Sequence, residues 1–289
     1  MISFRQHILT LVVIFMALAA GVALGGGPLS DLGRPAEAAA ADPAPTEPEP
    51  ADYAFTDAFA GYVASPLYAA RLHGHPVAIL ALPGADDDLV AALTGQVQAA
   101  GTQVIGTYAL RRTLVDPGEK TLVDTLGLQL VTQLGPGVVT DGATTYDRIG
   151  QLVGRAVATT KRSATMEAAK VSSLRASLKG AGLLGVPEGD PGNAPLVLVV
   201  SGKDLEPVVL TGLVDGLAAV ARGVVLAGPT ADADIAALRS SPPARPVATV
   251  DGIERGAGQV AAVLALIQVL ATPGGSFGAS GSDSPVPLG

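Results

Sequence analysis

Short apolar runs alternate with segments of helical periodicity along most of the chain. The runs are bounded by glycine or proline and predict buried strands over residues 77–82, 104–108, 196–200, 224–227 and 247–250. Between them, apolar residues recur every three or four positions, which predicts helices over residues 86–100, 117–134, 147–160, 165–179, 205–221, 232–240 and 256–271. The alternation predicts an α/β domain whose mostly parallel sheet is covered by helices on both faces.

A weaker helical pattern occupies residues 53–72, ahead of the first predicted strand. Its large apolar side chains fall near one face: Phe55, Phe59, Tyr62 and Val63. Pro66 predicts a break or a second helix start, because proline lacks the amide hydrogen that an interior helical position donates.

The longest uncharged stretch, residues 8–24, reads ILTLVVIFMALAAGVAL and contains no proline. With residues 25–27 it is long enough to cross a hydrocarbon core of about 30 Å as a helix, the conformation that satisfies its backbone in lipid. Arg5 precedes it and an acidic stretch follows, which predicts a single-pass anchor with a cytoplasmic N-terminus. The alternative is a secretory signal peptide, cleaved near the small residues at positions 38–41.

These patterns divide the chain into four predicted parts. Residues 1–27 form a short N-terminus and the membrane anchor helix, and residues 28–52 form a Pro/Ala/Glu-rich linker that favours an extended spacer. Residues 53–272 form the extracytoplasmic α/β domain. Residues 273–289 are rich in glycine and serine, and we expect them to be disordered.

Composition narrows the classes of partner. Charged residues make up 15% of the 289-residue chain and its net charge is −8, which argues against nucleic acid, because phosphates select clusters of Lys and Arg. Cysteine is absent, so disulfides, thiolate metal sites and cysteine nucleophiles are excluded. We expect the partners to be the membrane and either a second copy or an envelope protein. Small residues four apart in the anchor, at Ala17, Gly21 and Gly25, are typical of helix pairs in lipid.

Two turns that follow predicted strands form a candidate ligand crevice. Ser201 and Lys203 follow the strand over residues 196–200, and Gly228 and Thr230 follow the next strand. Ligands of open α/β sheets lie beyond the carboxyl ends of strands, where helix N-termini favour anions. The chain has no phosphate-loop or dinucleotide-binding motif and no recognisable Ser/His/Asp set, so the alternative is a plain connection and we expect no enzymatic activity.

His73 and His75 are the candidate metal ligands. They form the only histidine pair beyond the predicted anchor, and imidazole suits Cu(II), whereas Cu(I) prefers thiolate or thioether ligands. The alternative is that both are ordinary loop residues. Because cysteine is absent and the methionines are scattered, we expect copper to bind weakly at most to the α/β domain.

Several segments resemble the actinobacterial MctB-type copper transport protein family. They are MISFRQH at residues 1–7 with the anchor that ends in GVALG, the β-α-β segment at residues 76–110, the helix start at residues 147–153, and residues 250–266. The resemblance implies a membrane-associated envelope protein of copper homeostasis, in efflux or outer-membrane transport, with copper as a transported or weakly bound ion. Residues 28–52 depart from the charged, coiled-coil-like helix that usually follows the anchor in this family.

The sequence thus favours a membrane-anchored, non-enzymatic envelope protein of copper homeostasis. The alternative is a non-enzymatic envelope scaffold whose α/β domain binds a protein partner. A third hypothesis is an enzyme that uses the crevice near Ser201 and Gly228.

Overall fold

A seven-stranded sheet with the order β3-β2-β1-β4-β5-β6-β7 organises the computed structural model, which describes residues 50–159, 168–189, 191–203 and 205–287. The strands are β1 (Val77–Ala81), β2 (Val104–Leu110), β3 (Leu184–Gly185), β4 (Leu196–Val200), β5 (Gly223–Gly228), β6 (Ala248–Asp251) and β7 (Gly275–Gly278). The helices are α2 (Pro50–Tyr68), α3 (Asp87–Ala99), α4 (Arg112–Val115), η1 (Pro117–Glu119), α5 (Lys120–Leu134), α6 (Thr145–Val157), α7 (Ala168–Gly180), α8 (Pro207–Val220), α9 (Ala233–Ser240) and α10 (Gly256–Gln268).

The predicted mostly parallel sheet is confirmed. All five predicted strands are present as β1, β2, β4, β5 and β6, and each pairs in parallel with its neighbours among them. The short β3 pairs antiparallel with β2, so the sheet is mixed at that edge. The acidic start of α3 is also as expected, because the Asp86 carboxylate accepts hydrogen bonds from the amides of Asp88 and Leu89.

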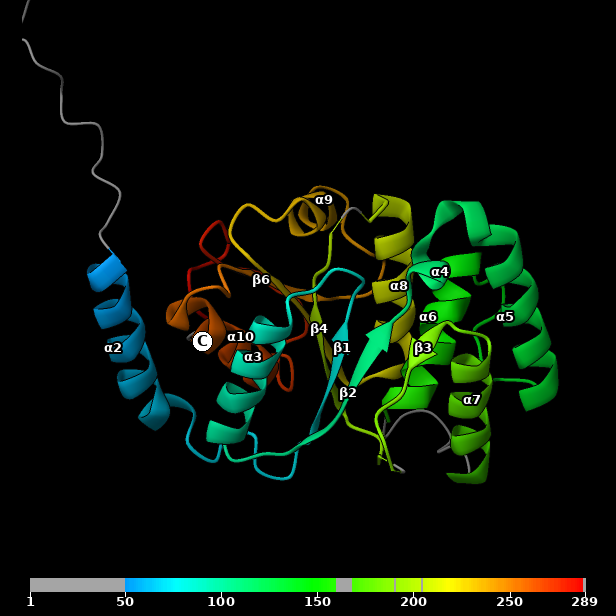
Figure 1. The fold of residues 1–289 in the computed structure, drawn as a ribbon, viewed down its shortest axis with the longest axis horizontal. Helices are drawn as coiled ribbons and strands as arrows, with labels where there is room; N and C mark the ends of the chain where they lie inside the picture. The colour runs from blue at the N-terminus through cyan, green and yellow to red at the C-terminus, as the bar shows by residue number, and fades with distance from the viewer. Residues whose placement is uncertain (1–49, 160–167, 190, 204, 288–289) are drawn as a thin grey trace, which may run out of the picture. The chain divides into compact units, whose positions relative to one another are not determined.

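Two apolar layers cover the sheet. Along the central strands successive side chains point to opposite faces, so Leu80 and Val199 join one layer while Ile79 and Leu198 join the other. Helices α4 to α9 contribute to the first layer and helices α2, α3 and α10 to the second (Figure 1). Because both faces are covered, the middle strands are apolar throughout, which explains why their runs lack alternation.

Helices α6 and α8 approach closely in the first layer. A Cβ at Gly150 would overlap the carbonyl oxygen of Leu213, and a Cβ at Gly216 would overlap that of Asp147. The two glycines therefore set the spacing between these helices.

The last crossover has a different hand from the others. Helix α3 links β1 to β2, which lies on one side of β1, and it packs on one face of the sheet. Helices α8 and α9 link β4 to β5 and β5 to β6, toward the other side of the sheet, and they pack on the opposite face. Because both the direction and the face are reversed, these three connections have the same hand. Helix α10 carries the chain onward from β6 to β7 but lies on the face of α3. Its crossover therefore has the opposite hand, although nearly all parallel crossovers are right-handed.

The prediction that residues 273–289 are disordered is wrong for the segment the structure describes. Residues 275–278 form β7, parallel to β6, and Phe277 is buried in the second layer. The amide of Gly278 donates to the carbonyl of Pro285, so the tail turns back over this strand. One buried aromatic ring and backbone pairing thus order a segment whose composition suggested disorder.

Helix α2 also differs from expectation. It begins at Pro50, within the predicted linker, and continues through Pro66 to Tyr68 without the predicted break. Pro66 lies on the exposed side, where water can hydrate the carbonyl that loses its donor. Among the described residues, no helix combines the length and apolar character needed to span a bilayer, and the predicted anchor at residues 8–24 lies outside them.

Candidate functional site

The turns after β1 and β4 meet at the switch point of the sheet. These strands are neighbours, but the chain passes from β1 to β2 on one side and from β4 to β5 on the other. In open α/β sheets this divergence opens a crevice where ligands bind. The sequence therefore placed Ser201 and Lys203 correctly at the carboxyl end of the sheet, next to the turn that carries Gly228.

Backbone contacts close this switch point. The amide of Lys203 donates to the carbonyl of Pro83 at 3.1 Å, and the amide of Ser201 donates to the carbonyl of Ala227 at 2.8 Å. Gly202 lies directly against the Pro83 carbonyl, where a Cβ would overlap it. The turns after β1 and β4 are thus bonded to each other, and the turn after β4 is also bonded to the end of β5.

Ser201 and Gly228 are brought together, and Asp232 joins them. The buried Ser201 hydroxyl donates to Oδ2 of Asp232, while Oδ1 of Asp232 accepts from the amide of Ile235 and caps α9. A Cβ at Gly228 would overlap the Ser201 hydroxyl, so glycine makes room for this contact. The three residues hold the N-terminus of α9 against the sheet.

Lys203 and Thr230 are exposed at the rim of the same region. The amide of Thr230 donates to a carboxylate oxygen of Glu254 at 3.0 Å. Two carboxylates of the chain, from Asp232 and Glu254, therefore occupy positions that an anion at these turns would use. The ligand crevice stays a prediction, and an incoming anion would have to compete with both groups.

The histidine pair lies at the opposite end of the sheet, in the turn before β1. The amide of His73 donates to the carbonyl of Ala70, and the carbonyl of His75 accepts from the Thr102 hydroxyl at 3.0 Å. The His73 side chain is exposed and that of His75 is half-buried. Within the described part of the chain, no three His, Asp or Glu side chains gather closely enough to hold a metal ion. Copper binding at this pair stays a prediction.

A buried charge network near β7 was missed in the sequence. The Asp251 carboxylate accepts from the Ser280 hydroxyl at 2.6 Å and from Nη2 of Arg239 at 3.1 Å. Burial opposes ionisation by desolvation, but hydrogen bonds from Ser280 and Arg239 outweigh it and lower the pKa of Asp251. An acidic residue at the end of a buried strand was the available signal, although its partners are distant in sequence.

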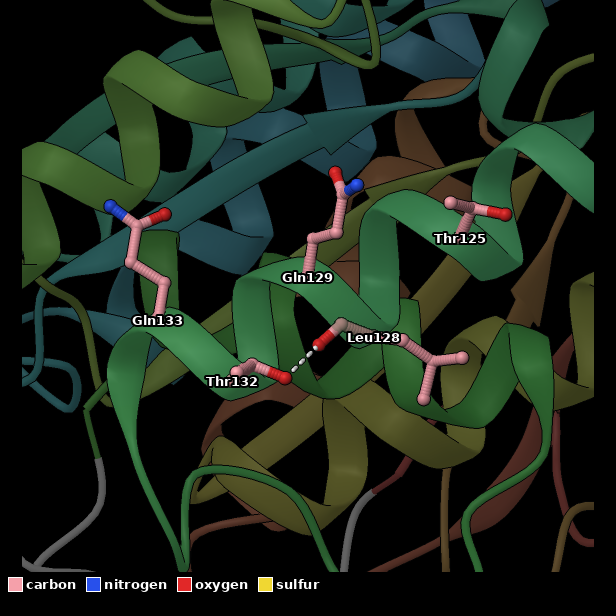
Figure 2. A pocket seen from close by; sticks show the side chains of 5 residues that line it. All are labelled: Thr125, Leu128, Gln129, Thr132 and Gln133. Atoms are coloured by element: carbon pink, nitrogen blue, oxygen red, sulfur yellow. Dashed lines mark hydrogen bonds between the residues drawn. The ribbon is translucent and has the colours of Figure 1, made fainter.

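A shallow depression of about 440 Å³ lies along α5 (Figure 2). Its lining residues are Thr125, Leu128, Gln129, Thr132 and Gln133, all from this helix. The Thr132 hydroxyl donates to the carbonyl of Leu128 at 2.9 Å, so it is engaged within the helix. No ionisable side chain lines the depression, and none of the predicted site residues contributes to it.

The fold and its switch point define a doubly wound α/β protein in which the turns after β1 and β4 are bonded to each other. The chain belongs to the MctB family, described as copper transport outer membrane protein, whose family model matches residues 1–287. It is similar to the copper transporter MctB of Mycobacterium tuberculosis strain H37Rv and of Mycobacterium bovis. Each is 29% identical over 293 residues, covering 92% of this chain and 92% of the relative.

Proposed function

We propose that this protein acts in copper homeostasis of the cell envelope as a membrane-anchored, non-enzymatic protein of copper efflux or transport. The observation that carries the proposal is the family match over residues 1–287, which includes the uncharged stretch at residues 8–24. The family and both relatives carry names that indicate copper transport. The α/β domain lies outside the cytoplasm, and the family's description favours association with an outer membrane.

Protease digestion of intact spheroplasts tests this topology. We expect external protease to remove the domain and to leave a small anchored fragment that contains residues 8–24. Protection of the whole chain would contradict a cytoplasmic N-terminus with an external domain. Release of an intact domain without protease would instead support a cleaved signal peptide.

The geometry of the switch point supports a non-enzymatic role. The Ser201 hydroxyl donates to Asp232, which already caps α9, and no histidine lies in the turns that follow β1, β4 and β5. A serine nucleophile needs an adjacent base that can take its proton and return it. An aspartate that is fixed as a helix cap is poorly placed for that task.

Copper is the cargo of this protein and not a resident cofactor. The described domain offers His73 and His75 as nitrogen ligands in one turn, and the whole chain contains no cysteine. Tight Cu(I) binding needs soft sulfur ligands, and tight Cu(II) binding needs several nitrogen ligands. The contact between copper and this chain is therefore transient, and assembly or a partner completes the set of ligands.

Copper content and tolerance of cells with and without the gene test the function. We expect deletion to raise cellular copper and to lower copper tolerance, and a plasmid copy to restore both. Zinc tolerance serves as the control and should not change. Unchanged copper content and tolerance in the deletion strain would overturn the proposal.

A second candidate function is a scaffold that binds an envelope protein. The observation that favours it is the exposed surface of α5, where Leu128 lines the shallow depression and Leu122 of the same helix is also exposed. Recovery of one stable envelope complex, together with unchanged copper content after deletion, would favour this candidate.

A further inference from the structure

Helix α2 presents its large apolar side chains away from the domain. Its inner side carries the buried residues Ala64 and Tyr68, and the helix packs on α10. The outward side carries five large apolar residues that are 42–87% exposed: Phe55, Phe59, Tyr62, Val63 and Leu67. We call these five residues the aromatic stripe. They recur at three- and four-residue spacing, so they lie along one face of the helix.

The orientation of α2 is fixed by specific contacts. The Asp57 carboxylate accepts from the amide of Gly256 at 2.8 Å at the start of α10. The guanidinium of Arg255 lies 3.5 Å from the centre of the Tyr53 ring. Tyr68 donates to the side chain of Gln96 on α3 at 2.6 Å. These bonds hold the helix with the aromatic stripe outward, so its exposure is built into the fold.

We propose that the aromatic stripe is the interface between two copies of this chain, with α2 packed against α2 about a twofold axis. At their observed exposures the five side chains present roughly 600 Å² of surface, since a fully exposed Phe or Tyr offers about 150–250 Å². If both stripes were fully covered, the two copies together would bury roughly 1,200 Å² of surface, which exceeds the ~1,000 Å² expected of a specific interface. Phe55 and Phe59 already stack, with ring centroids 6.3 Å apart, and form a preorganised surface.

The chemistry of α2 favours a second copy over a lipid surface. Residues 50–68 contain no Lys or Arg, whereas helices that lie on membranes carry these residues to bind anionic headgroups. The stripe itself is uncharged, and aromatic residues without charge are typical of the core of protein interfaces. In a twofold dimer the aromatic stripe of one copy contacts the aromatic stripe of the other, so one self-complementary surface is enough to form the interface.

The place of α2 in the chain adds a second argument, which rests on the proposed function. The helix follows 49 residues that include the predicted anchor. Two copies anchored in one membrane are confined to its plane, which raises their local concentration. The outward stripe and its area do not depend on the anchor, so a failure of the copper experiment would leave the dimer proposal standing.

Cysteine cross-linking in native membranes tests the pairing directly. The natural chain has no cysteine, so in a Tyr62→Cys variant any bis-maleimide cross-link between two copies must join the two introduced thiols, and its product is recognised by its mass of twice the chain. We expect a cross-linked dimer from Tyr62→Cys and from Phe59→Cys. Thr121→Cys, on the exposed surface of α5, is the matched control and should remain monomeric. Equal yields from all three variants, or no dimer from the first two, would overturn the proposal.

Sedimentation of the full chain in mild detergent gives an independent measure. We expect the wild type to be dimeric at micromolar concentration and the double change of Phe59→Asp and Tyr62→Asp to weaken self-association at least tenfold. Leu128→Asp on α5 changes a residue that is 49% exposed and should leave the dimer intact. Because all these side chains are exposed, far-ultraviolet circular dichroism should show the same folded α/β domain in every variant, whereas the thermal midpoint of the double Asp variant should lose the contribution of dimerisation. A monomeric wild type, or a dimer unaffected by the double change, would overturn the proposal.

Other occupants of the stripe give distinct results. If residues 1–49 covered it, maleimide labelling of Tyr62→Cys would become faster when those residues were deleted. If lipid covered it, a monomer would bind phosphatidylglycerol vesicles through residues 50–289, and the double Asp change would abolish binding. If the full chain is monomeric, either result would overturn the dimer proposal and would identify residues 1–49 or lipid as the occupant of the aromatic stripe.

Discussion

Replacing Asp251 by Ala should destabilise the domain through its C-terminal strand. The carboxylate accepts from the amide and hydroxyl of Ser280 and from Arg239, all within the region where β6, β7 and α9 meet. Hydrogen bonds to a charged group contribute about 1.5–3 kcal/mol each. Removing one member of a buried ion pair costs about 3–5 kcal/mol, because the other charge is left without its partner.

We expect Asp251→Ala to lower the free energy of unfolding by about 3 kcal/mol, the lower end of the range for a broken buried ion pair. Arg239 would retain its hydrogen bonds to the Thr249 hydroxyl at 2.9 Å and to the carbonyl of Phe277 at 2.6 Å. Asp283→Ala is the matched control in the same tail. Its exposed carboxylate accepts from the amide of Ser276, and removing it should cost less than about 1 kcal/mol.

Urea denaturation of residues 50–289, followed by far-ultraviolet circular dichroism, measures these losses. Circular dichroism is the suitable probe because the chain contains no tryptophan. The Asp251→Ala change should lower the midpoint without altering the slope, and combining it with Ser280→Ala should cost less than the sum of both changes. A loss below about 0.5 kcal/mol, or one no larger than that of Asp283→Ala, would refute the assigned role of this network.

Further expectations concern pH, packing and metal. Because folding lowers the pKa of Asp251, its stabilisation is present at neutral pH, and the advantage of wild type over Asp251→Asn should shrink as pH falls below about 4 in urea titrations. Gly216→Val should cost at least about 1–3 kcal/mol of unfolding free energy, because α6 and α8 would be forced apart; an unchanged midpoint would contradict this. Val199→Asp should abolish cooperative unfolding, because the free-energy cost of an unpaired charge at this buried position is comparable with the total stability of many domains. Titration with Cu(II) against a chelator should reveal at most a weak site, lost when His73 and His75 become Ala; a nanomolar site that survives would contradict the ligand inventory.

The sequence predicted the five central strands because each is apolar on both faces and bounded by glycine or proline. It missed β3 and β7 for different reasons. A two-residue strand such as Leu184–Gly185 is too short to show a period. The strand Gly275–Gly278 has one large apolar residue, Phe277, and its order depends on partners far away in the sequence.

The sequence predicted where the residues of the candidate crevice lie, but not the contacts that they make. The rule that turns follow parallel strands at one edge correctly brought Ser201 near Gly228. That Asp232 would accept the Ser201 hydroxyl depends on side-chain rotamers and on the exact approach of α9, which spacing does not encode. Likewise, helical periodicity placed Phe55 and Phe59 on one face of α2 but could not tell that this face points outward.

Strand β7 pairs with the edge of β6 that would otherwise be open. A strand edge with free amides and carbonyls is a template for another chain, and proteins cover such edges to remain dispersed. Here residues 275–278 cover β6 as β7, and the chain then folds back so that the amide of Gly278 donates to the carbonyl of Pro285. Because β7 follows β6 in the chain, β6 stays uncovered until β7 has been synthesised. A chain that ends before β7 would keep its central strands but expose the edge of β6, so truncation here should lead to aggregation before loss of fold.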